Sequence, residues 1–282
     1  MSSSTCFHFQ QANYSVQNNA LLYAHQKRAI RHIHSKLRRV PLGFATHHTL
    51  LVEVAVGCGK SAIIYSLVYS LAVSKVLVVV PGLQLRAQLG QKWIFTLLLL
   101  KIIPDETDLP IVCVTTNIAE LADMSADCTT HVVIINTEAF RGSAFQQELR
   151  QQSQSSGGIA VDAFQLLIVD EAHHKPSSTY RAFMSFFACH KVLLTATPER
   201  RDCLLIHYTS QAFRYSIEQG IHDRIIKTPV LLRYSDAMDD KAALPVHPGA
   251  EPAPCKRLPG QAAAPREPHS DGHSVREDYP GV

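Results

Sequence analysis

The feature that most constrains this chain is an apolar run that ends in a glycine turn. Residues 50–54 have the pattern of a buried β-strand, and Gly57 and Gly59 follow before Lys60 and Ser61 open a helical pattern. Glycine has no Cβ, so the backbone N–H groups of such a turn can approach phosphate oxygens closely at a helix N-terminus. Lys60 would neutralise β- and γ-phosphates, and the Ser61 hydroxyl would ligate Mg²⁺.

A second apolar run, residues 166–169, brings two carboxylates to the end of a strand. Asp170 would hold Mg²⁺ through a bound water, and Glu171 would orient and deprotonate an attacking water. Each run alone has an ordinary interpretation, since a pair of acids after an apolar run also fits the solvated start of a helix. Both runs in this order, each with a buried-strand pattern, favour a nucleoside triphosphate site.

From Asp170 to His173 the chain reads Asp-Glu-Ala-His, and here it resembles a known family. It is similar to the first RecA-like domain of superfamily-two, DEAH-type helicases and translocases, from about residue 20 to about residue 230. The resemblance implies a RecA-like P-loop domain of the α/β class that uses ATP and Mg²⁺. It gives Lys60, Asp170 and Glu171 catalytic roles, and makes Ser61 and Asp170 the metal ligands.

Residues 22–30 resemble the Q motif of this family, in which a glutamine reads the edge of adenine by paired hydrogen bonds. Gln26 matches that glutamine. Cys58 occupies the variable position of the glycine loop. The resemblance therefore implies this nucleotide-binding set: Gln26, Gly57, Cys58, Gly59, Lys60 and Ser61.

Three further blocks follow in the family's order. Residues 78–88 resemble motif Ia, which holds nucleic-acid phosphates at a strand end and helix start. Residues 134–137 resemble a later phosphate-contacting block, and residues 193–200 resemble motif III, which couples the nucleotide site to the nucleic-acid track. The implied nucleic-acid and coupling residues are Pro81, Arg86, Gln88, Thr137, His173, Thr195 and Thr197.

Details of these blocks favour one branch of the family. Residues 195–198 read Thr-Ala-Thr-Pro, whereas DEAH enzymes of messenger-RNA processing typically carry Ser-Ala-Thr. The glycine loop begins with Val54, and Val56 stands where threonine is usual. Together with the His173-His174 pair, these features resemble the type III restriction subunit and UvrB-like group, which implies DNA rather than RNA as the nucleic-acid partner.

Composition agrees with an intracellular α/β protein. The 282 residues are 46% hydrophobic, enough for one or two domains with sizeable cores. The net charge of +3 permits nucleic-acid binding without requiring it. The seven cysteines include no C-x-x-C pair and no secretory signal is visible, so we expect reduced thiols in the nucleus or cytoplasm. Residues 62–80 are apolar enough to imitate a membrane span, but Lys75 and serines interrupt them, so no membrane contact is expected.

Strand-like runs alternate with helical patterns, which predicts a parallel sheet covered by helices on both faces. The predicted strands are residues 50–54, 75–80, 111–114, 132–135, 166–169 and 191–194. Residues 94–103 are expected to form a core helix. In such sheets ligands bind at the carboxyl ends of the strands, where each motif falls.

The chain is expected to divide into three parts. Residues 1–19 would be an N-terminal extension, residues 20–230 the ATP-binding RecA-like domain, and residues 231–282 the start of a truncated second domain with a disordered, proline-rich tail. The family completes its site with arginines from motif VI of a second RecA-like domain, and no Gln-x-x-Gly-Arg-x-x-Arg pattern is present. A second RecA-like domain or a full-length helicase could act as partner in trans.

These observations predict a nucleic-acid-dependent ATPase domain of the helicase and translocase type. Two other functions stay open. The chain could be a catalytically incomplete regulatory protein that binds ATP or nucleic acid, which the missing arginines favour. It could also be a P-loop switch or kinase unrelated to nucleic acid, although motifs Ia and III stand where an acceptor site or lid would be expected.

Three smaller features have both a functional and an ordinary interpretation. The basic residues between Lys27 and Arg39 could bind phosphates or serve as a localisation signal, or they could be a solvated helix face. The histidine pairs at 47–48 and 173–174 could bind metal, but adjacent histidines point to different sides. Cys58 could be a redox switch or simply a side chain at a variable position.

Overall fold

The computed structural model describes residues 13–37, 47–71, 73–103, 109–127, 129–140, 159–174, 178–198 and 206–228. All of them belong to one compact unit, Met1–Leu231. The second-domain start and disordered tail expected over residues 231–282 lie outside the described residues, as do residues 1–12 of the expected N-terminal extension.

A seven-stranded sheet forms the centre of this unit, and every neighbouring pair of strands in it is parallel. The strand order is β3-β4-β2-β5-β6-β1-β7. The strands are β1 (Thr49–Val54), β2 (Val76–Val80), β3 (Val112–Thr115), β4 (Val132–Asn136), β5 (Leu166–Val169), β6 (His190–Thr195) and β7 (Ser210–Tyr215). The predicted parallel sheet and all of its predicted strands are confirmed.

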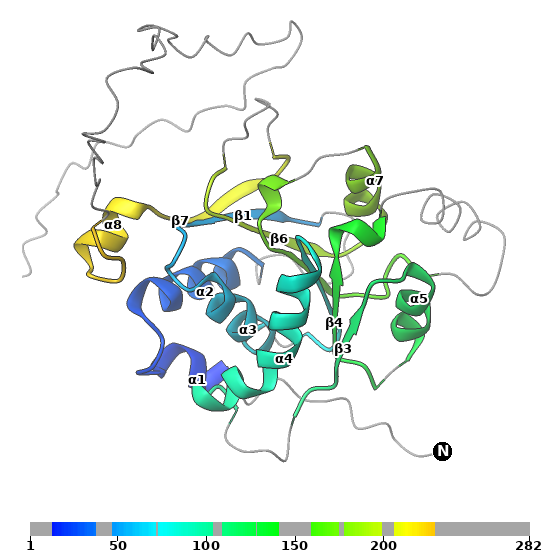
Figure 1. Ribbon diagram of the computed structural model, residues 1–282, viewed down its shortest axis with the longest axis horizontal. Helices are drawn as coiled ribbons and strands as arrows, with labels where there is room; N and C mark the ends of the chain where they lie inside the picture. The colour runs from blue at the N-terminus through cyan, green and yellow to red at the C-terminus, as the bar shows by residue number, and fades with distance from the viewer. Residues whose placement is uncertain are drawn as a thin grey trace, which may run out of the picture. The chain divides into compact units, whose positions relative to one another are not determined.

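Helices cover both faces of the sheet, as predicted (Figure 1). One face packs against α1 (Asn13–Asn18), α2 (Ala24–Leu37), α3 (Lys60–Ser70) and α4 (Leu83–Leu99). The other face packs against α5 (Ile118–Ala126), the short helix η3 (Thr137–Phe140) and α7 (Ser178–Phe186). The remaining elements are η4 (Ala172–His174) and α8 (Ile217–His222).

The two cores explain why the strands read as continuous apolar runs. Alternate side chains of a strand point to opposite faces, so both sets are buried when helices cover both faces. In β1, Leu50 and Val52 belong to the core under α1 to α4, whereas Leu51 belongs to the core under α5 and α7. Each strand therefore needs apolar residues at successive positions.

The helix expected over residues 94–103 is confirmed as far as Leu99, where α4 ends, and residues 100–103 form a turn instead. The helix α4 buries Trp93 and Leu97. The apolar stretch 62–80 divides between α3 and β2, and β2 agrees with the strand predicted over residues 75–80. Among the described residues, no helix has both the length and the apolar character needed to cross a bilayer.

The edge strand β7 was missing from the sequence prediction. Its residues, Ser-Gln-Ala-Phe-Arg-Tyr, show neither alternation nor a continuous apolar run, and only Ala212 and Tyr215 are buried. A polar contact joins it to β1, where the buried carboxylate of Glu53 accepts from Arg214 Nε at 3.2 Å and from Gln211 Nε2 at 3.2 Å. An edge strand held by such tertiary contacts has little local signal.

Lys75 fixes one end of α5 to the start of β2. Its Nζ donates to the carbonyl oxygens of Met124 at 3.1 Å, Ser125 at 2.7 Å and Asp127 at 2.6 Å. These carbonyls lie at the C-terminal end of α5, where intrahelical donors are absent and the helix dipole is negative. The ammonium thus satisfies three acceptors at once.

Replacing this ammonium should destabilise the fold. We expect Lys75→Met to lower the free energy of unfolding by about 1 to 2 kcal/mol, because three acceptors lose a charged donor at a partly solvated site. Chemical denaturation monitored by circular dichroism measures this change. Lys92→Met, at an exposed position of α4, is the control and should change stability by less than about 0.5 kcal/mol. Equal effects of the two substitutions would contradict the capping role.

Candidate functional site

The loop between β1 and α3 has the backbone geometry of a phosphate-binding turn. Gly57 and Gly59 both lie in the left-handed region, with φ values of 82° and 76°. The N–H of Cys58 donates to Ala55 O at 3.2 Å, which closes the turn. A Cβ at Gly59 would lie 2.4 Å from Gln26 Nε2, whereas a Cβ at Gly57 would meet nothing within 4 Å. Both glycines are therefore needed for their φ, and a Cβ at Gly59 would also displace the Gln26 amide from the loop.

The side chain of Cys58 points into the protein core. It is 1% exposed, and its Sγ lies next to the backbone of Gly220 in α8, where an added Cβ would be 3.1 Å away. Burial raises the pKa of the Cys58 thiol. A buried thiol with a raised pKa carries little thiolate, so the ordinary interpretation of Cys58 is favoured over a redox switch.

Two side chains at the start of α2 bind the carbonyl oxygens of this loop. Gln26 Nε2 donates to Cys58 O at 3.4 Å and to Gly59 O at 3.3 Å, and its Oε1 accepts from Tyr23 N at 2.9 Å. His25 Nε2 lies 2.8 Å from Cys58 O. In this structure the Gln26 amide thus contacts the loop, and its reading of adenine stays a prediction.

His25 was not singled out by the sequence. Its ring stacks on that of Tyr215 with centroids 4.2 Å apart, and Tyr215 in turn donates its hydroxyl to Asp223 at 2.8 Å. Desolvation lowers the pKa of His25, so the neutral ring is favoured at pH 7. A carbonyl oxygen only accepts, so Nε2 is the protonated nitrogen of that neutral ring. The only sequence signal was the position of His25 beside Gln26.

Asp170 and Glu171 follow β5 and turn toward the loop. The N–H of Asp170 donates to Val79 O at 2.8 Å, which extends the pairing of β5 with β2. Glu171 has a φ of 48°, an uncommon conformation for a residue other than glycine. Its N–H donates to Asp170 Oδ1 at 3.0 Å.

The left-handed turn brings the Glu171 carboxylate to the lysine of the glycine loop. Lys60 Nζ and Glu171 Oε1 are 2.7 Å apart, and the two side chains are 11% and 19% exposed. The ammonium and the carboxylate therefore neutralise each other at the mouth of the loop. This contact joins the two motifs that the sequence analysis placed in one site.

A second polar chain runs from Glu171 to the end of β6. His173 Nδ1 lies 3.4 Å from Glu171 Oε2 and 2.8 Å from Thr195 Oγ1. Thr195 Oγ1 also donates to Thr197 O at 3.0 Å and accepts from Thr197 N at 3.1 Å. The structure thus links the side chains of His173 and Thr195 to the backbone of Thr197, and the coupling role of these residues stays a prediction.

The other predicted site residues lie at the same edge of the sheet. Ser61 is exposed in the first turn of α3, Arg86 and Gln88 lie in the first turns of α4 after Pro81, and Thr137 opens η3 after β4. In a parallel sheet all carboxyl ends meet at one edge, which is why motifs far apart in sequence converge. No contact that the structure describes joins Arg86, Gln88 or Thr137 to the Lys60–Glu171 pair.

The oxygen donors of this edge suit Mg²⁺. Asp170 offers a carboxylate that is 8% exposed, and Ser61 offers a hydroxyl beside Lys60. Mg²⁺ prefers hard oxygen ligands and usually takes one or two from the protein. Among the described residues no group of three or more histidines, cysteines or acids could hold a metal by itself.

Comparison with known proteins gives matches over the same region. Residues 19–200 match the family model of the type III restriction enzyme, res subunit. A probable helicase of African swine fever virus, from a Kenyan pig isolate, is 26% identical over 181 residues, which is 61% of this chain and 20% of that protein. Its counterpart from a Malawian tick isolate is 27% identical over 183 residues, with the same coverage. The chain thus spans about a fifth of the length of these relatives.

A solved structure shares the fold. It is a nuclease-deletion mutant of the Type ISP restriction-modification enzyme LlaGI in complex with a DNA substrate mimic, with a TM-score of 0.51 and 16% identity over 72% of this chain and 20% of that one. The predicted RecA-like fold is confirmed by this likeness and by the parallel sheet. Since the family model covers more than half of the sequence, the chain belongs to the family of the type III restriction enzyme res subunit, within the superfamily-two helicases.

Proposed function

We propose that residues 20–230 form the ATP-binding domain of a nucleic-acid-dependent ATPase of the helicase and translocase type. The observation that carries the proposal is the ion pair between Lys60 and Glu171 at the mouth of a glycine loop. A lysine at that place can hold β- and γ-phosphates, and a carboxylate beside it can reach a water that attacks the γ-phosphate.

In this proposal the two charged groups exchange partners during the reaction. A γ-phosphate bound at the loop competes with Glu171 for the Lys60 ammonium. The released carboxylate then orients the attacking water and accepts its proton. Mg²⁺, held by Ser61 and by Asp170 through water, would neutralise charge that develops on the phosphates.

The chain from His173 to Thr197 would report the state of the nucleotide. Glu171 and Thr195 both contact His173 Nδ1, at 3.4 Å and 2.8 Å, so a shift of the carboxylate changes the surroundings of the ring. Thr197 is exposed two residues after the end of β6, beside the edge where we propose that Pro81, Arg86, Gln88 and Thr137 contact phosphates. DNA is proposed as the substrate because the restriction enzyme that shares the fold was solved with a DNA substrate mimic.

The first experiment tests the nucleotide site. Lys60→Ala should reduce the affinity for a fluorescent ATP analogue in Mg²⁺ by at least a hundredfold, because the ammonium that neutralises the phosphates is lost. The matched control is Lys92→Ala, which removes the same charge from the exposed face of α4 and should leave affinity within twofold. Equal affinity of the Lys60 variant and the wild type would refute the site.

A second experiment separates the roles of the carboxylates. Glu171→Gln should keep or increase affinity for the ATP analogue, since the amide neither competes for Lys60 as strongly nor repels phosphate. The same variant should lower steady-state turnover roughly a hundredfold or more, because an amide cannot accept a proton from water. Asp170→Ala should instead weaken the dependence of binding on Mg²⁺. Wild-type turnover by Glu171→Gln, in a preparation cleared of contaminating ATPases, would show that another residue is the base.

The alternative is that the chain is a catalytically incomplete regulatory protein. The rate of ATP hydrolysis distinguishes this alternative from an active ATPase domain. In the part of the chain that the structure describes, the cation paired with Glu171 is a lysine, Lys60, and the sequence lacks the Gln-x-x-Gly-Arg-x-x-Arg pattern. An arginine at the γ-phosphate can contribute about a thousandfold or more in rate. We therefore expect slow ATP hydrolysis that DNA barely stimulates.

Adding a second RecA-like domain of a relative in trans should raise this rate only if its motif VI arginines are intact. A version of that domain with both arginines changed to alanine is the control. Strong DNA-stimulated hydrolysis by the 282-residue chain alone would contradict the need for an added domain. Arg200 and Arg201, which lie outside the described residues, would then be the first arginines to replace.

A further inference from the structure

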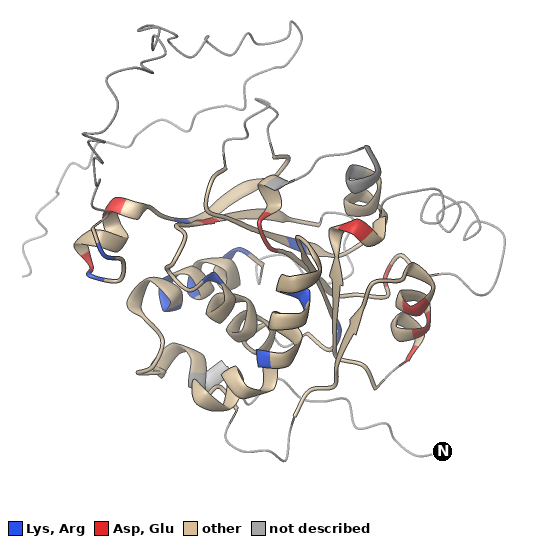
Figure 2. Ribbon diagram, viewed as in Figure 1, with Lys and Arg blue, Asp and Glu red and all other residues tan. Residues whose placement is uncertain are grey.

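Charge is distributed unevenly over the two helical layers of the sheet. Between Asn13 and Ile103, the part of the chain that contains α1 to α4, Glu53 is the single acidic residue. Glu53 is 7% exposed and paired with Arg214, so it does not neutralise the outer surface of the helices. Figure 2 shows basic segments along α2 and α4 and acidic segments on α5 and α8.

The helix α2 concentrates this positive charge on one side. It buries Ala29, Ile30, Ile33 and Leu37 against the sheet and α3. The exposed positions of its outer side recur at helical spacing, and they are Arg28, Arg31, His32, Ser35 and Lys36. We call these five residues the α2 stripe. Its cations extend from Arg28 to Lys36, about 12 Å along the axis at about 1.5 Å per residue.

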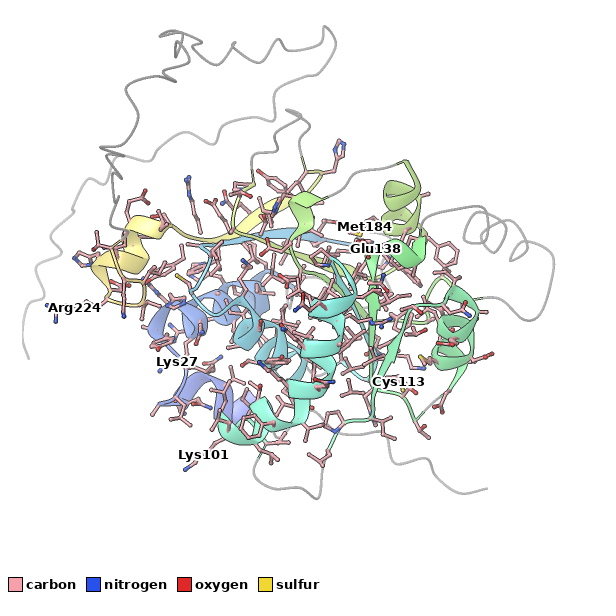
Figure 3. The ribbon with its side chains drawn as sticks, viewed as in Figure 1. Lys27, Lys101, Cys113, Glu138, Met184 and Arg224 are labelled. Atoms are coloured by element: carbon pink, nitrogen blue, oxygen red, sulfur yellow. The ribbon has the colours of Figure 1, made fainter. Side chains whose placement is uncertain are left out.

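The cations of the α2 stripe differ in how far the protein neutralises them. Arg28 lies near the carboxylate of Asp223, which partly neutralises its charge. Hydrogen bonds from His222 and Tyr215 lower the pKa of Asp223, and the positive charge of Arg28 lowers it further. Among the described residues, no carboxylate lies within ion-pair distance of Arg31 or Lys36. Lys27 is not part of the stripe, because its Nζ donates to Asn19 O at 3.0 Å on the side toward α1 (Figure 3).

We propose that the α2 stripe is a docking surface for the phosphate backbone of duplex DNA, separate from the proposed track along motif Ia and Thr137. Duplex DNA carries one phosphate per about 3.4 Å of axis on each strand, so a stripe of about 12 Å faces several phosphates at once. Guanidinium groups such as those of Arg28 and Arg31 match phosphate oxygens in a bidentate way.

Two other polyanions fit the stripe less well. Helices that bind anionic membranes insert exposed Trp, Phe or Leu side chains, whereas the large aliphatic side chains of α2, Ile30, Ile33 and Leu37, are buried. Surfaces for single strands offer aromatic rings on which bases stack. The one ring of the stripe, His32, packs edge-on against Phe213 with centroids 5.9 Å apart, so its surroundings favour a purely ionic contact.

The place of α2 in the fold separates the stripe from the proposed catalytic track. The helix α3 contacts both α2 and α4 and lies between them. Neighbouring helix axes are about 8 to 10 Å apart, so the α2 stripe and the first turns of α4 are separated by about two such spacings. Binding of duplex DNA by the α2 stripe does not require ATP hydrolysis. It can therefore be tested separately from the proposed ATPase activity.

The test is the anisotropy of a labelled duplex of roughly 20 base pairs, titrated with the whole chain at several salt concentrations. The variant Arg31→Gln with Lys36→Gln should bind at least fivefold more weakly at low salt. The slope of log affinity against log salt should become shallower by about two, because each lost phosphate contact contributes about 0.9. The control is Lys101→Gln with Lys227→Gln, which removes two exposed charges elsewhere, one of them in the turn that follows α4 (Figure 3). It should change affinity by less than twofold.

Further variants and ligands make the outcome decisive. Arg31→Lys with Lys36→Arg keeps both charges and should retain most of the affinity. All variants should keep the wild-type melting temperature and affinity for the ATP analogue, which shows that the fold and the nucleotide site are intact. In a background of Arg86→Ala with Gln88→Ala, the loss caused by Arg31→Gln with Lys36→Gln should be of the same size, since separate surfaces contribute additively.

Three results would overturn the proposal. Equal losses of duplex binding in the stripe variant and in the Lys101 and Lys227 control would mean that total charge alone matters. No loss in the stripe variant would mean that α2 does not contact DNA. A greater loss for vesicles of phosphatidylserine and phosphatidylcholine, or for a single strand of the same length, than for the duplex would assign the stripe to that other polyanion.

Discussion

The ion pair between Lys60 and Glu171 is the contact on which the candidate site depends. It joins a loop after β1 to a turn after β5, at a separation of 2.7 Å. Both charges are largely removed from water, and each stabilises the other. If either side chain were replaced, the remaining charge would be buried without a partner, which is strongly destabilising. The positive φ of Glu171 and the glycines of the loop are the local conformations that allow this contact.

The parallel sheet makes that contact possible. Between β1 and β5 in the strand order lies β6, which ends in Thr195 and supplies the partner of His173. Loop, acidic turn and threonine therefore follow three neighbouring strands. The buried apolar strands hold these ends in place, and the polar groups at the edge adjust to one another within a rigid frame.

Much of this arrangement could be predicted from the sequence, for identifiable reasons. The strands under two helical layers are continuously apolar, and the glycine loop and acidic run have fixed local chemistry, so fold and motifs were readable. The edge strand β7 and the contact of His25 with Cys58 O were not. Both depend on residues distant in sequence, as does the contact between Gln26 and the loop carbonyls. The positive φ of Glu171 also has no local signal, because a glutamate rarely adopts the left-handed conformation.

The central claim is that a γ-phosphate and Glu171 compete for the same ammonium group. Titration calorimetry with ATP and with ADP, in the wild type and in Glu171→Gln, tests this competition most directly. In the proposed site both nucleotides would place their α- and β-phosphates in the loop, so the ratio of the two affinities would isolate the contribution of the γ-phosphate. If the claim is correct, the substitution raises the ratio of ATP affinity to ADP affinity by at least threefold. An unchanged ratio would show that the Lys60–Glu171 pair does not occupy the place of the γ-phosphate, and would contradict the account.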